Sequence, residues 1–560
     1  MKVTLRSNFE PGSPREAVRR AQWTALGLTD ADMKKPKIAV VNSSSELAIC
    51  FSHLDGIAKV VKEEIRAAGG IPFEVRTAAP SDFIISAGHV GYILASRDLI
   101  VNDMEIAIEG AQLDGMICLS SCDKTPPAHL MAAGRFNIPT ILVICGYQPA
   151  GTYEGKPVDI EDVFMGSVQA ALGKLDKKKL KVMSENAIRG PGVCAGMATA
   201  NSMHVAVEAL GMALPGSAPV LANSPKMFDA ARRSGRRIVE MVLEDLKPRQ
   251  ILTPGAFRNA VASVLAVSGS INCIKHLQAT AVEAGVDLDV FRLFNDLGDS
   301  VPVLSAVRPN GEDTIEDFEA AGGAHALLKQ LAPLLDTQAL TVTGHTLGEN
   351  LRNAVVANAE VIRPLERPFS RQAPIVVLHG NLAPESAIVK LGLRGLDRKA
   401  KFSGPARVYD DAALAMNDIG KGTVQRGEVL VVRGMGTKGG PAMAGNASGI
   451  VFALDSAGLQ SDVAFVTDGQ LSGLCNKGLT VAEVSPESAV GGPLALVEDG
   501  DRIDIDVDGR SLELRVAEAE LAARRARRGE PPLPASTGYL SIYQRTVQPM
   551  STGAVLIKQP

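Results

Sequence analysis

The sequence predicts an α/β protein built from two unlike parts: a mostly parallel α/β region, then a β-barrel-like region with flanking helices. In the first half of the 560 residues, β-branched runs alternate with stretches that have helical apolar spacing. In the last third, short apolar strands follow one another with close turns. Hydrophobic residues make up 46% and charged residues 21% of the chain, which excludes a largely disordered protein.

The N-terminal α/β part is expected to span residues 1–360. Residues 37–44 and 140–149 are predicted strands, and residues 54–70 are a predicted helix that ends at Gly-Gly. Residues 115–124 are predicted as a strand that runs into a polar loop. Ligands of parallel α/β sheets gather beyond the carboxyl ends of the strands, and two cysteine-bearing loops are expected there.

The predicted linker is residues 361–374, a segment with three prolines that follows a mainly helical stretch at 225–350. The C-terminal part, residues 375–560, is predicted to be the barrel-like domain. Its expected strands include VLVVRG, VAFVTDG, RIDIDVDG and LELRV. Residues 521–532 are predicted as a charged surface helix and its stop.

The charge balance excludes several classes of partner. Lys and Arg total 58 against 62 Asp and Glu, which leaves a net charge of −4 and no basic field for nucleic acid or anionic lipid. The N-terminal stretch lacks the apolar core of a secretory signal, and no run reaches the roughly 18 apolar residues of a membrane span. We therefore expect a cytoplasmic protein whose seven cysteines are thiols or metal ligands.

The cysteines divide by their surroundings. Three stand in polar or Gly-rich loops that a cofactor could approach: Cys50, Cys122 and Cys194. The others are interpreted as buried structural residues: Cys118, Cys145, Cys273 and Cys475. Spacing alone leaves open whether the three loop cysteines bind a metal, because the chain has no C-x-x-C pair of the kind found in zinc ribbons and ferredoxins.

Two further motifs carry candidate site residues. Cys122 is followed by Asp123 and Lys124, so a soft ligand, a hard oxygen ligand and an amine are adjacent. The alternative is a surface Asp-Lys pair of little energetic value. The second motif, VTDGQLSGLCNKG at 466–478, places Ser472 in a Gly-rich loop after a predicted strand, either as a site residue or as part of a plain turn.

A Gly-x-Gly-x-x-Gly pattern at 434–439 matches the fingerprint of dinucleotide-binding proteins. Because a lone match in a β-rich region is weak, we interpret this loop as a holder of an anionic substrate through its backbone N–H groups rather than of a nicotinamide cofactor. His53 and His89 lie near the candidate loops and are interpreted as structural residues.

Several motifs resemble the dihydroxy-acid dehydratase and phosphogluconate dehydratase family. SSCDKTPPAHLMAAG resembles the family's Cys-Asp-Lys signature, and VTDGQLSG resembles its Thr-Asp-Gly-Arg-x-Ser-Gly signature. VNSSSELAICFSHL and GVCAGMATANSM look like its other two cysteine loops. The resemblance runs from about residue 6 to residue 550, and its separated motifs stand in the right order.

The resemblance implies an iron–sulfur hydro-lyase that dehydrates a 2,3-dihydroxy carboxylic acid to the 2-keto acid. It implies a [2Fe-2S] cluster, or a [4Fe-4S] cluster as in some relatives, held by Cys50, Cys122 and Cys194. It also implies a homodimer or homotetramer. Two alternatives stay open: a sugar-acid dehydratase of the same chemistry, and a non-catalytic iron–sulfur paralogue.

The resemblance further implies a magnesium site and a catalytic base. Asp82, Asp123 and a carbamylated Lys124 would hold Mg²⁺, and Ser472 would take the substrate proton. Phe83 stands where the family has Gly beside the first of these ligands.

The sequence departs from the family pattern at two more places. Gln470 replaces an Arg, and residues 441–446 read PAMAGN where the family has a magnesium-ligating Glu. We expect a replacement oxygen from Asn446 or water, or from Glu483 or Glu487.

Overall fold

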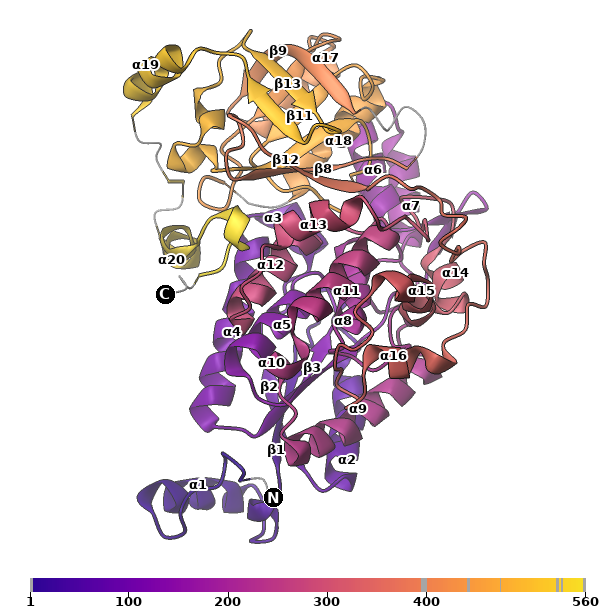
Figure 1. Ribbon diagram of the computed structural model, residues 1–560, viewed down its shortest axis with the longest axis vertical. Coiled ribbons are helices and arrows are strands. Elements are labelled where there is room, and N and C mark those ends of the chain that lie inside the picture. The colour runs from indigo at the N-terminus through magenta and orange to yellow at the C-terminus, as the bar shows by residue number, and fades with distance from the viewer. Residues whose placement is uncertain are drawn as a thin grey trace.

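The computed structural model describes residues 4–393, 400–440, 444–473, 475–529, 533–534 and 537–556, and for residues 444–446 the backbone alone. Figure 1 shows the N-terminal half as a sheet surrounded by helices, with the C-terminal β-rich half stacked on one end of it. Within the described residues, no helix combines the length and apolar character needed to cross a bilayer.

The N-terminal half is built on a parallel four-stranded sheet in the order β2-β1-β3-β4. The strands are β1 (Lys37–Asn42), β2 (Ile71–Arg76), β3 (Gly115–Ser120) and β4 (Thr140–Ile144). All residues of β1, β3 and β4 are buried, as expected for parallel strands covered on both faces. The predicted strands at 37–44, 115–124 and 140–149 are confirmed.

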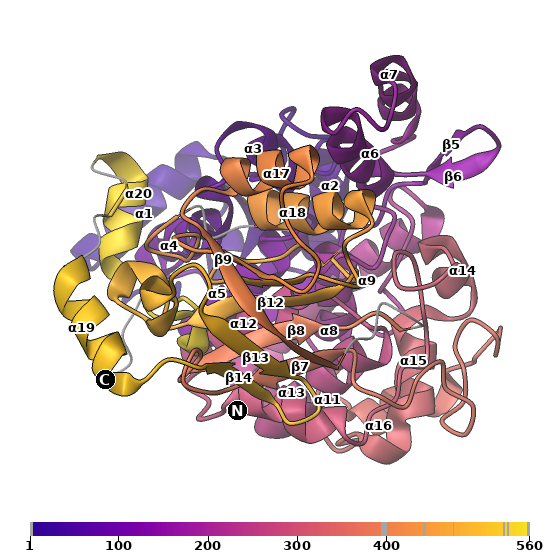
Figure 2. The same ribbon diagram turned by 90° about the horizontal axis from the view of Figure 1, so that it is seen from above.

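Helices make up most of the rest of this half. They are α1 (Pro14–Ala25), α2 (Leu54–Ala67), α3 (Asp82–Gly88), α4 (Tyr92–Ala111), α5 (Thr125–Phe136), α6 (Ile160–Ala171), α7 (Lys177–Asn186), α8 (Thr199–Ala209), α9 (Pro225–Glu244), α10 (Pro248–Ile251), α11 (Pro254–Ala266), α12 (Asn272–Ala284), α13 (Val290–Gly298), α14 (Ile315–Ala320), α15 (Gly323–Leu331) and α16 (Leu347–Asn350). A hairpin of β5 (Gly151–Tyr153) and β6 (Lys156–Val158) projects beside α7 (Figure 2).

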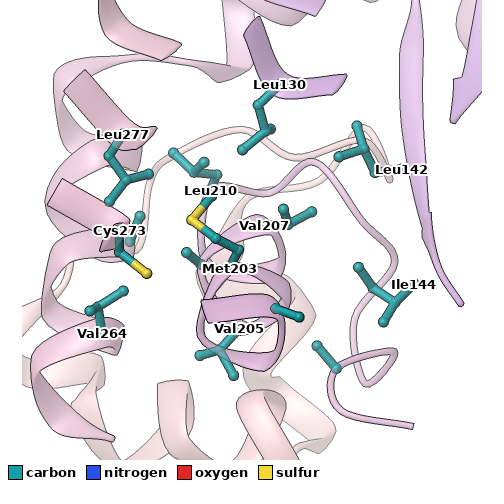
Figure 3. Close-up of a cluster of buried hydrophobic side chains, with 14 of the residues drawn as sticks. Leu130, Leu142, Ile144, Met203, Val205, Val207, Leu210, Val264, Cys273 and Leu277 are labelled. Carbon is teal, nitrogen blue, oxygen red and sulfur yellow. The ribbon is translucent and has the colours of Figure 1, made fainter. Parts of the chain in front are cut away.

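The central helices are buried on nearly every face because they are enclosed by other helices. Every residue of α8 is buried, and so is nearly every residue of α11 and α12. Figure 3 shows the packing of Met203 on α8 among side chains of the neighbouring elements, Cys273 on α12 included. Cys273 is fully buried there, which confirms its interpretation as a small core residue.

The C-terminal half contains an eight-stranded sheet in the order β14-β13-β9-β10-β11-β12-β8-β7. Its strands are β7 (Ile375–Leu378), β8 (Ser386–Lys390), β9 (Lys401–Tyr409), β10 (Val429–Val432), β11 (Ala464–Thr467), β12 (Leu479–Ser485), β13 (Arg502–Asp506) and β14 (Ser511–Leu514). The helices are α17 (Ala412–Lys421), α18 (Ala444–Ala457), α19 (Glu518–Arg528) and α20 (Gly538–Thr546). α17 and α18 lie side by side on one flank (Figure 2).

The sheet is nearly closed. The four central strands, β9 to β12, are parallel, and antiparallel strands flank them on both sides. The two outer strands meet because the N–H group of His379 donates to Arg510 and that of Leu512 donates to His379. The predicted β-barrel-like fold is therefore confirmed.

Alternate side chains of the barrel strands pack into two different hydrophobic cores. Val429 and Val431 of β10 pack inside the barrel, whereas Leu430 and Val432 belong to the core shared with α18 and the N-terminal half. The predicted linker, 361–374, is packed against the N-terminal half. The backbones of Arg363, Phe369 and Ser370 form hydrogen bonds with the backbone of residues 303–304.

Candidate active site

Two of the three loop cysteines meet at the carboxyl end of the parallel sheet. Cys50 follows β1, and Cys122 follows the neighbouring strand β3. Both residues are buried, and their thiols interact. The hydrogen bond to Cys50, together with burial, raises the pKa of the Cys122 thiol well above its usual value. A cation that binds both sulfurs would reverse this effect, because it favours the thiolate.

Cys194 approaches the same place from a different loop, the one that precedes α8. Burial raises the pKa of the Cys194 thiol, and the neighbouring negative charges of Asp123, Glu161 and Cys50 raise it further. The fold therefore gathers Cys50, Cys122 and Cys194, which lie in three separate loops, near Asp123. All seven cysteines are free thiols.

Asp82, Asp123 and Lys124 form a buried charged trio. Asp82 begins α3, and its Oδ2 lies 2.9 Å from Lys124 Nζ, which is 3.9 Å from Asp123 Oδ2. Burial raises the pKa of Asp82 despite the ammonium beside it. Burial alone would lower the pKa of Lys124, but the two carboxyl groups outweigh it and raise that pKa. The alternative of an exposed, weak Asp-Lys pair is wrong, since Lys124 is only 1% exposed.

The donor atoms at this place fit both implied groups. Three soft sulfurs suit iron, and two carboxylates beside a lysine suit a hard cation once the amine carries a carboxylate. Asp82 Oδ1 is buried and has no hydrogen-bond partner among the described residues. The described residues hold no group of three His, Cys, Asp or Glu side chains arranged around one ion.

The loop with Ser472, in the C-terminal half, packs against the N-terminal half. The Ser472 N–H donates to Ser448 Oγ on α18 at 3.0 Å. The next residue, Gly473, packs so closely on Ser270 that an added Cβ would lie 2.7 Å from its side chain. Ser270 Oγ is 2.9 Å from the hydroxyl of Thr199, which begins α8 directly after the Cys194 loop. A larger residue at this position would clash with Ser270, so the glycine permits this close contact between the two halves.

One residue of the site had no signal in the sequence. Glu161, near the start of α6, is 4% exposed, and its Oε1 has no hydrogen-bond partner in the described part of the chain. Its carboxyl group lies against Gly196, where an added Cβ would be 2.6 Å from Oε1. Burial raises the pKa of Glu161, and Asp159 and Asp162 raise it further. A negative residue in a helical pattern reads as exposed, so sequence patterns did not reveal it.

The glycine loop at 434–439 is held by carboxylates of the protein itself. The N–H groups of Gly434 and Met435 donate to Asp468, and those of Lys438 and Gly439 donate to Glu487. These four amides are therefore not available to a substrate anion or a dinucleotide phosphate. The expectation that this loop binds an anionic substrate through them is not supported.

Glu483 and Glu487, two proposed substitutes for the missing Glu, both have carboxyl groups that are engaged with other residues of the protein. Both oxygens of Glu487 accept hydrogen bonds from the glycine loop. Glu483 Oε1 lies 2.5 Å from Lys275 Nζ, and both side chains are completely buried. The segment 441–443 and the side chain of Asn446 lie outside the described residues.

Phe83 and Gln470, two positions where the sequence departs from the family pattern, have different surroundings. Phe83 packs edge-on against Phe164 on α6, whose ring in turn contacts Phe452 on α18, with ring centroids 6.4 and 5.3 Å apart. Phe83 therefore packs on Phe164, the ring that contacts the C-terminal half. Gln470 is 1% exposed, and its amide nitrogen has no hydrogen-bond partner among the described residues.

The two histidines differ in position. His53 Nε2 is 2.7 Å from the carbonyl oxygen of Cys145, and burial lowers the pKa of His53. His89 lines a cavity of about 500 Å³ together with the glycine loop and α20. This cavity adjoins α3, the helix that begins at Asp82.

The comparisons with known proteins identify the family of the chain. Residues 35–350 match the family model for the dihydroxy-acid/6-phosphogluconate dehydratase N-terminal region, and residues 360–554 match the C-terminal one. A protein named dihydroxy-acid dehydratase from Methanococcoides burtonii is 42% identical over 98% of this chain and 100% of its own. Dihydroxy-acid dehydratase 1 from Methanosarcina acetivorans is 42% identical over 99% of this chain and 100% of its own. The dihydroxy-acid dehydratase from Moorella thermoacetica is 41% identical, also over 99% of this chain and 100% of its own.

The fold, the site and these matches define the class of protein: a hydro-lyase, which removes water from its substrate. The chain belongs to the dihydroxy-acid/6-phosphogluconate dehydratase family.

Proposed function

We propose that this protein dehydrates a small 2,3-dihydroxy carboxylic acid to the 2-keto acid in branched-chain amino acid biosynthesis. One observation carries the proposal: Asp123 adjoins Cys122 in the chain, shares Lys124 with Asp82, and its charge raises the pKa of the Cys194 thiol. Sulfur ligands and oxygen ligands are therefore adjacent, as a reaction that binds two parts of one small substrate requires.

Cys50, Cys122 and Cys194 would hold a [2Fe-2S] cluster, and Asp82, Asp123 and carbamylated Lys124 would hold Mg²⁺. When bound, these groups supply a Lewis acid for the departing hydroxyl and positive charge that acidifies the C2–H bond.

Ser472 is proposed as the base. Its Oγ, as an alkoxide, accepts the proton from C2, and the C–H electron pair forms the C2–C3 double bond while hydroxide leaves C3. The enol product becomes the ketone when its hydroxyl proton is lost and a proton adds to C3. The Ser448 hydroxyl supports this role, because it accepts from the Ser472 N–H and orients the loop.

The substrate would enter through the cavity beside α3. Its backbone and side-chain lining, which includes Ser86, Thr437 and Gln544, is polar enough to pass a hydroxy acid. The three relatives above carry the dihydroxy-acid name, and no contact in the described residues favours the sugar-acid alternative.

We also propose the cytoplasm as the compartment, because free thiols and an iron–sulfur cluster persist under reducing conditions. The homodimer or homotetramer stays a prediction, which light scattering would test.

A substrate panel tests the function. Anaerobically reconstituted enzyme is incubated with 2,3-dihydroxyisovalerate, gluconate or glycerate, and the 2-keto acid is trapped with semicarbazide. We expect turnover of the branched dihydroxy acid at least tenfold above gluconate. Preferential turnover of gluconate would assign the sugar-acid activity instead, and no turnover by iron-loaded enzyme would contradict a catalytic role.

A further inference from the structure

A buried lysine joins the two halves beside the proposed base. Lys390, the last residue of β8, is 2% exposed. Its Nζ donates to the carbonyl oxygens of Ser268 at 3.0 Å, Gly269 at 2.9 Å and Gly473 at 3.0 Å. An ammonium group has three protons, so each of them is used. Within the described residues, no carboxylate lies within ion-pair distance of this nitrogen.

The three carbonyl groups belong to both halves of the molecule. Ser268 and Gly269 form the turn between α11 and α12, whereas Gly473 directly follows Ser472. The same turn is bound to α8, because the N–H of Ser270 donates to Ser202 Oγ at 2.9 Å. α8 follows the Cys194 loop. Lys390 therefore connects the loop of the proposed base to the helix that continues from a cluster ligand.

The turn that receives Lys390 has an unfavourable backbone conformation. Ser268 has φ +48°, which non-glycine residues rarely adopt. Its carbonyl oxygen accepts from Lys390 and also from Asn310 Nδ2 at 2.9 Å. Two donors thus hold this turn in place, and the lysine is the one that also holds the Ser472 loop.

We infer that Lys390 is a positioning residue for the dehydration: it sets the Ser472 loop against the cluster-bearing half of the protein. The inference rests on the proposed function of Ser472 as the base. A lysine is needed because a single fully buried group must donate to three carbonyl oxygens from two directions. A neutral side chain such as Gln has only two protons to donate and would leave one carbonyl unsatisfied.

The charge state of Lys390 should be visible in the pH dependence. Burial lowers the pKa of Lys390 to about 8, although Cys475, Cys273 and Glu161, which face it, oppose the shift. Above that pH the neutral amine has two protons for three carbonyl groups. The loop would then lose one of its restraints, and kcat should decline on the alkaline side.

The test compares Lys390→Met with the wild type as reconstituted holoenzymes acting on 2,3-dihydroxyisovalerate. Methionine has a similar length and no protons to donate. Because small displacements of a catalytic group cost up to about 10²-fold, we expect kcat to fall ~10- to 100-fold. KM should stay within about threefold and iron content unchanged, since neither depends on this loop. The alkaline decline of kcat near pH 8 should disappear in the variant.

Lys37→Met is the matched control. Lys37 is also completely buried, and its Nζ donates to Asn8 Oδ1 at 2.9 Å, but it begins β1, at the end of the sheet away from the cysteines. This variant should lose stability and keep kcat. Equal losses of kcat in both variants, or a wild-type kcat in Lys390→Met, would overturn the inference.

Ser472→Ala, measured in parallel, separates the two proposals. If it is active, the assignment of the base fails whatever Lys390→Met does. If it is inactive and Lys390→Met turns over at the wild-type rate, only the inference about Lys390 fails.

Discussion

Lys124 Nζ lies 2.9 Å from Oδ2 of Asp82, so a buried ammonium occupies the position between two carboxyl groups. With both carboxyl groups ionised, the trio carries a net charge of −1. Addition of CO₂ to the amine would convert that cation into an anion and leave three anionic groups around one point. The net charge would then be −3, and a divalent cation would return it to −1, so carbamylation and Mg²⁺ binding should be coupled.

The first prediction concerns this coupling. We expect EDTA-treated enzyme to lose activity at least tenfold, because the missing family Glu leaves fewer anionic ligands to retain Mg²⁺. Mg²⁺ with bicarbonate should restore activity better than Mg²⁺ alone. Lys124→Arg, which keeps the cation and cannot form a carbamate, should fold and bind iron but not recover. Stoichiometric Mg²⁺ that resists EDTA would contradict the prediction.

The second prediction concerns the cluster. Cys50→Ser, Cys122→Ser and Cys194→Ser should each lose the visible absorption and most of the bound iron, because a hydroxyl is a poor ligand for iron. Cys273→Ser is the control, since that thiol lies in the apolar core of Figure 3, and it should keep both. Iron analysis and absorbance of anaerobically reconstituted protein measure the result. Full iron content in Cys194→Ser would show that the ligand assignment is wrong.

The third prediction concerns the base. Ser472→Ala should keep the cluster and lose kcat by ~10²–10⁴, the usual contribution of a general base. Exchange of the C2 proton with solvent deuterium should disappear with it. Ser263→Ala is the control, because that hydroxyl is buried in the helical core and donates to Ala260 within α11. A Ser472→Ala rate within about threefold of the wild type would exclude this serine as the base.

The fourth prediction concerns the buried ion pair between α12 and β12. Lys275 Nζ lies 2.5 Å from Glu483 Oε1, and neither side chain has exposed surface. Burial lowers the pKa of Lys275 and raises that of Glu483, so each depends on the other to stay charged. Lys275→Met should reduce the free energy of unfolding by ~3–5 kcal/mol, because it leaves an unpaired buried carboxylate.

The double variant completes that test. Lys275→Met combined with Glu483→Gln should recover most of the loss, since no buried charge then remains. Urea unfolding followed by circular dichroism gives the four free energies of the cycle. If the double variant were as unstable as the sum of the single ones, the two side chains would act independently.

The strands of the parallel sheet could be predicted from sequence because burial on both faces makes each a continuous apolar run, as at 37–44 and 140–149. β2 was missed, since its alternating polar residues are half-buried. The antiparallel strands β7 and β8 were also missed, and so was the closure of the barrel through His379 and Ser511. Pairing between distant segments leaves no local periodicity.

The sequence by itself determined the chemistry available: three loop cysteines, the Asp123-Lys124 pair and a serine in a glycine-rich loop, each marked by a local motif. Tertiary structure alone decided that Glu161 is buried beside the Cys194 loop and that Lys390 holds Gly473. Local motifs reflect backbone requirements over a few residues. The charge, burial and partner of a side chain depend on segments hundreds of residues away, and those become neighbours only when the two halves fold together.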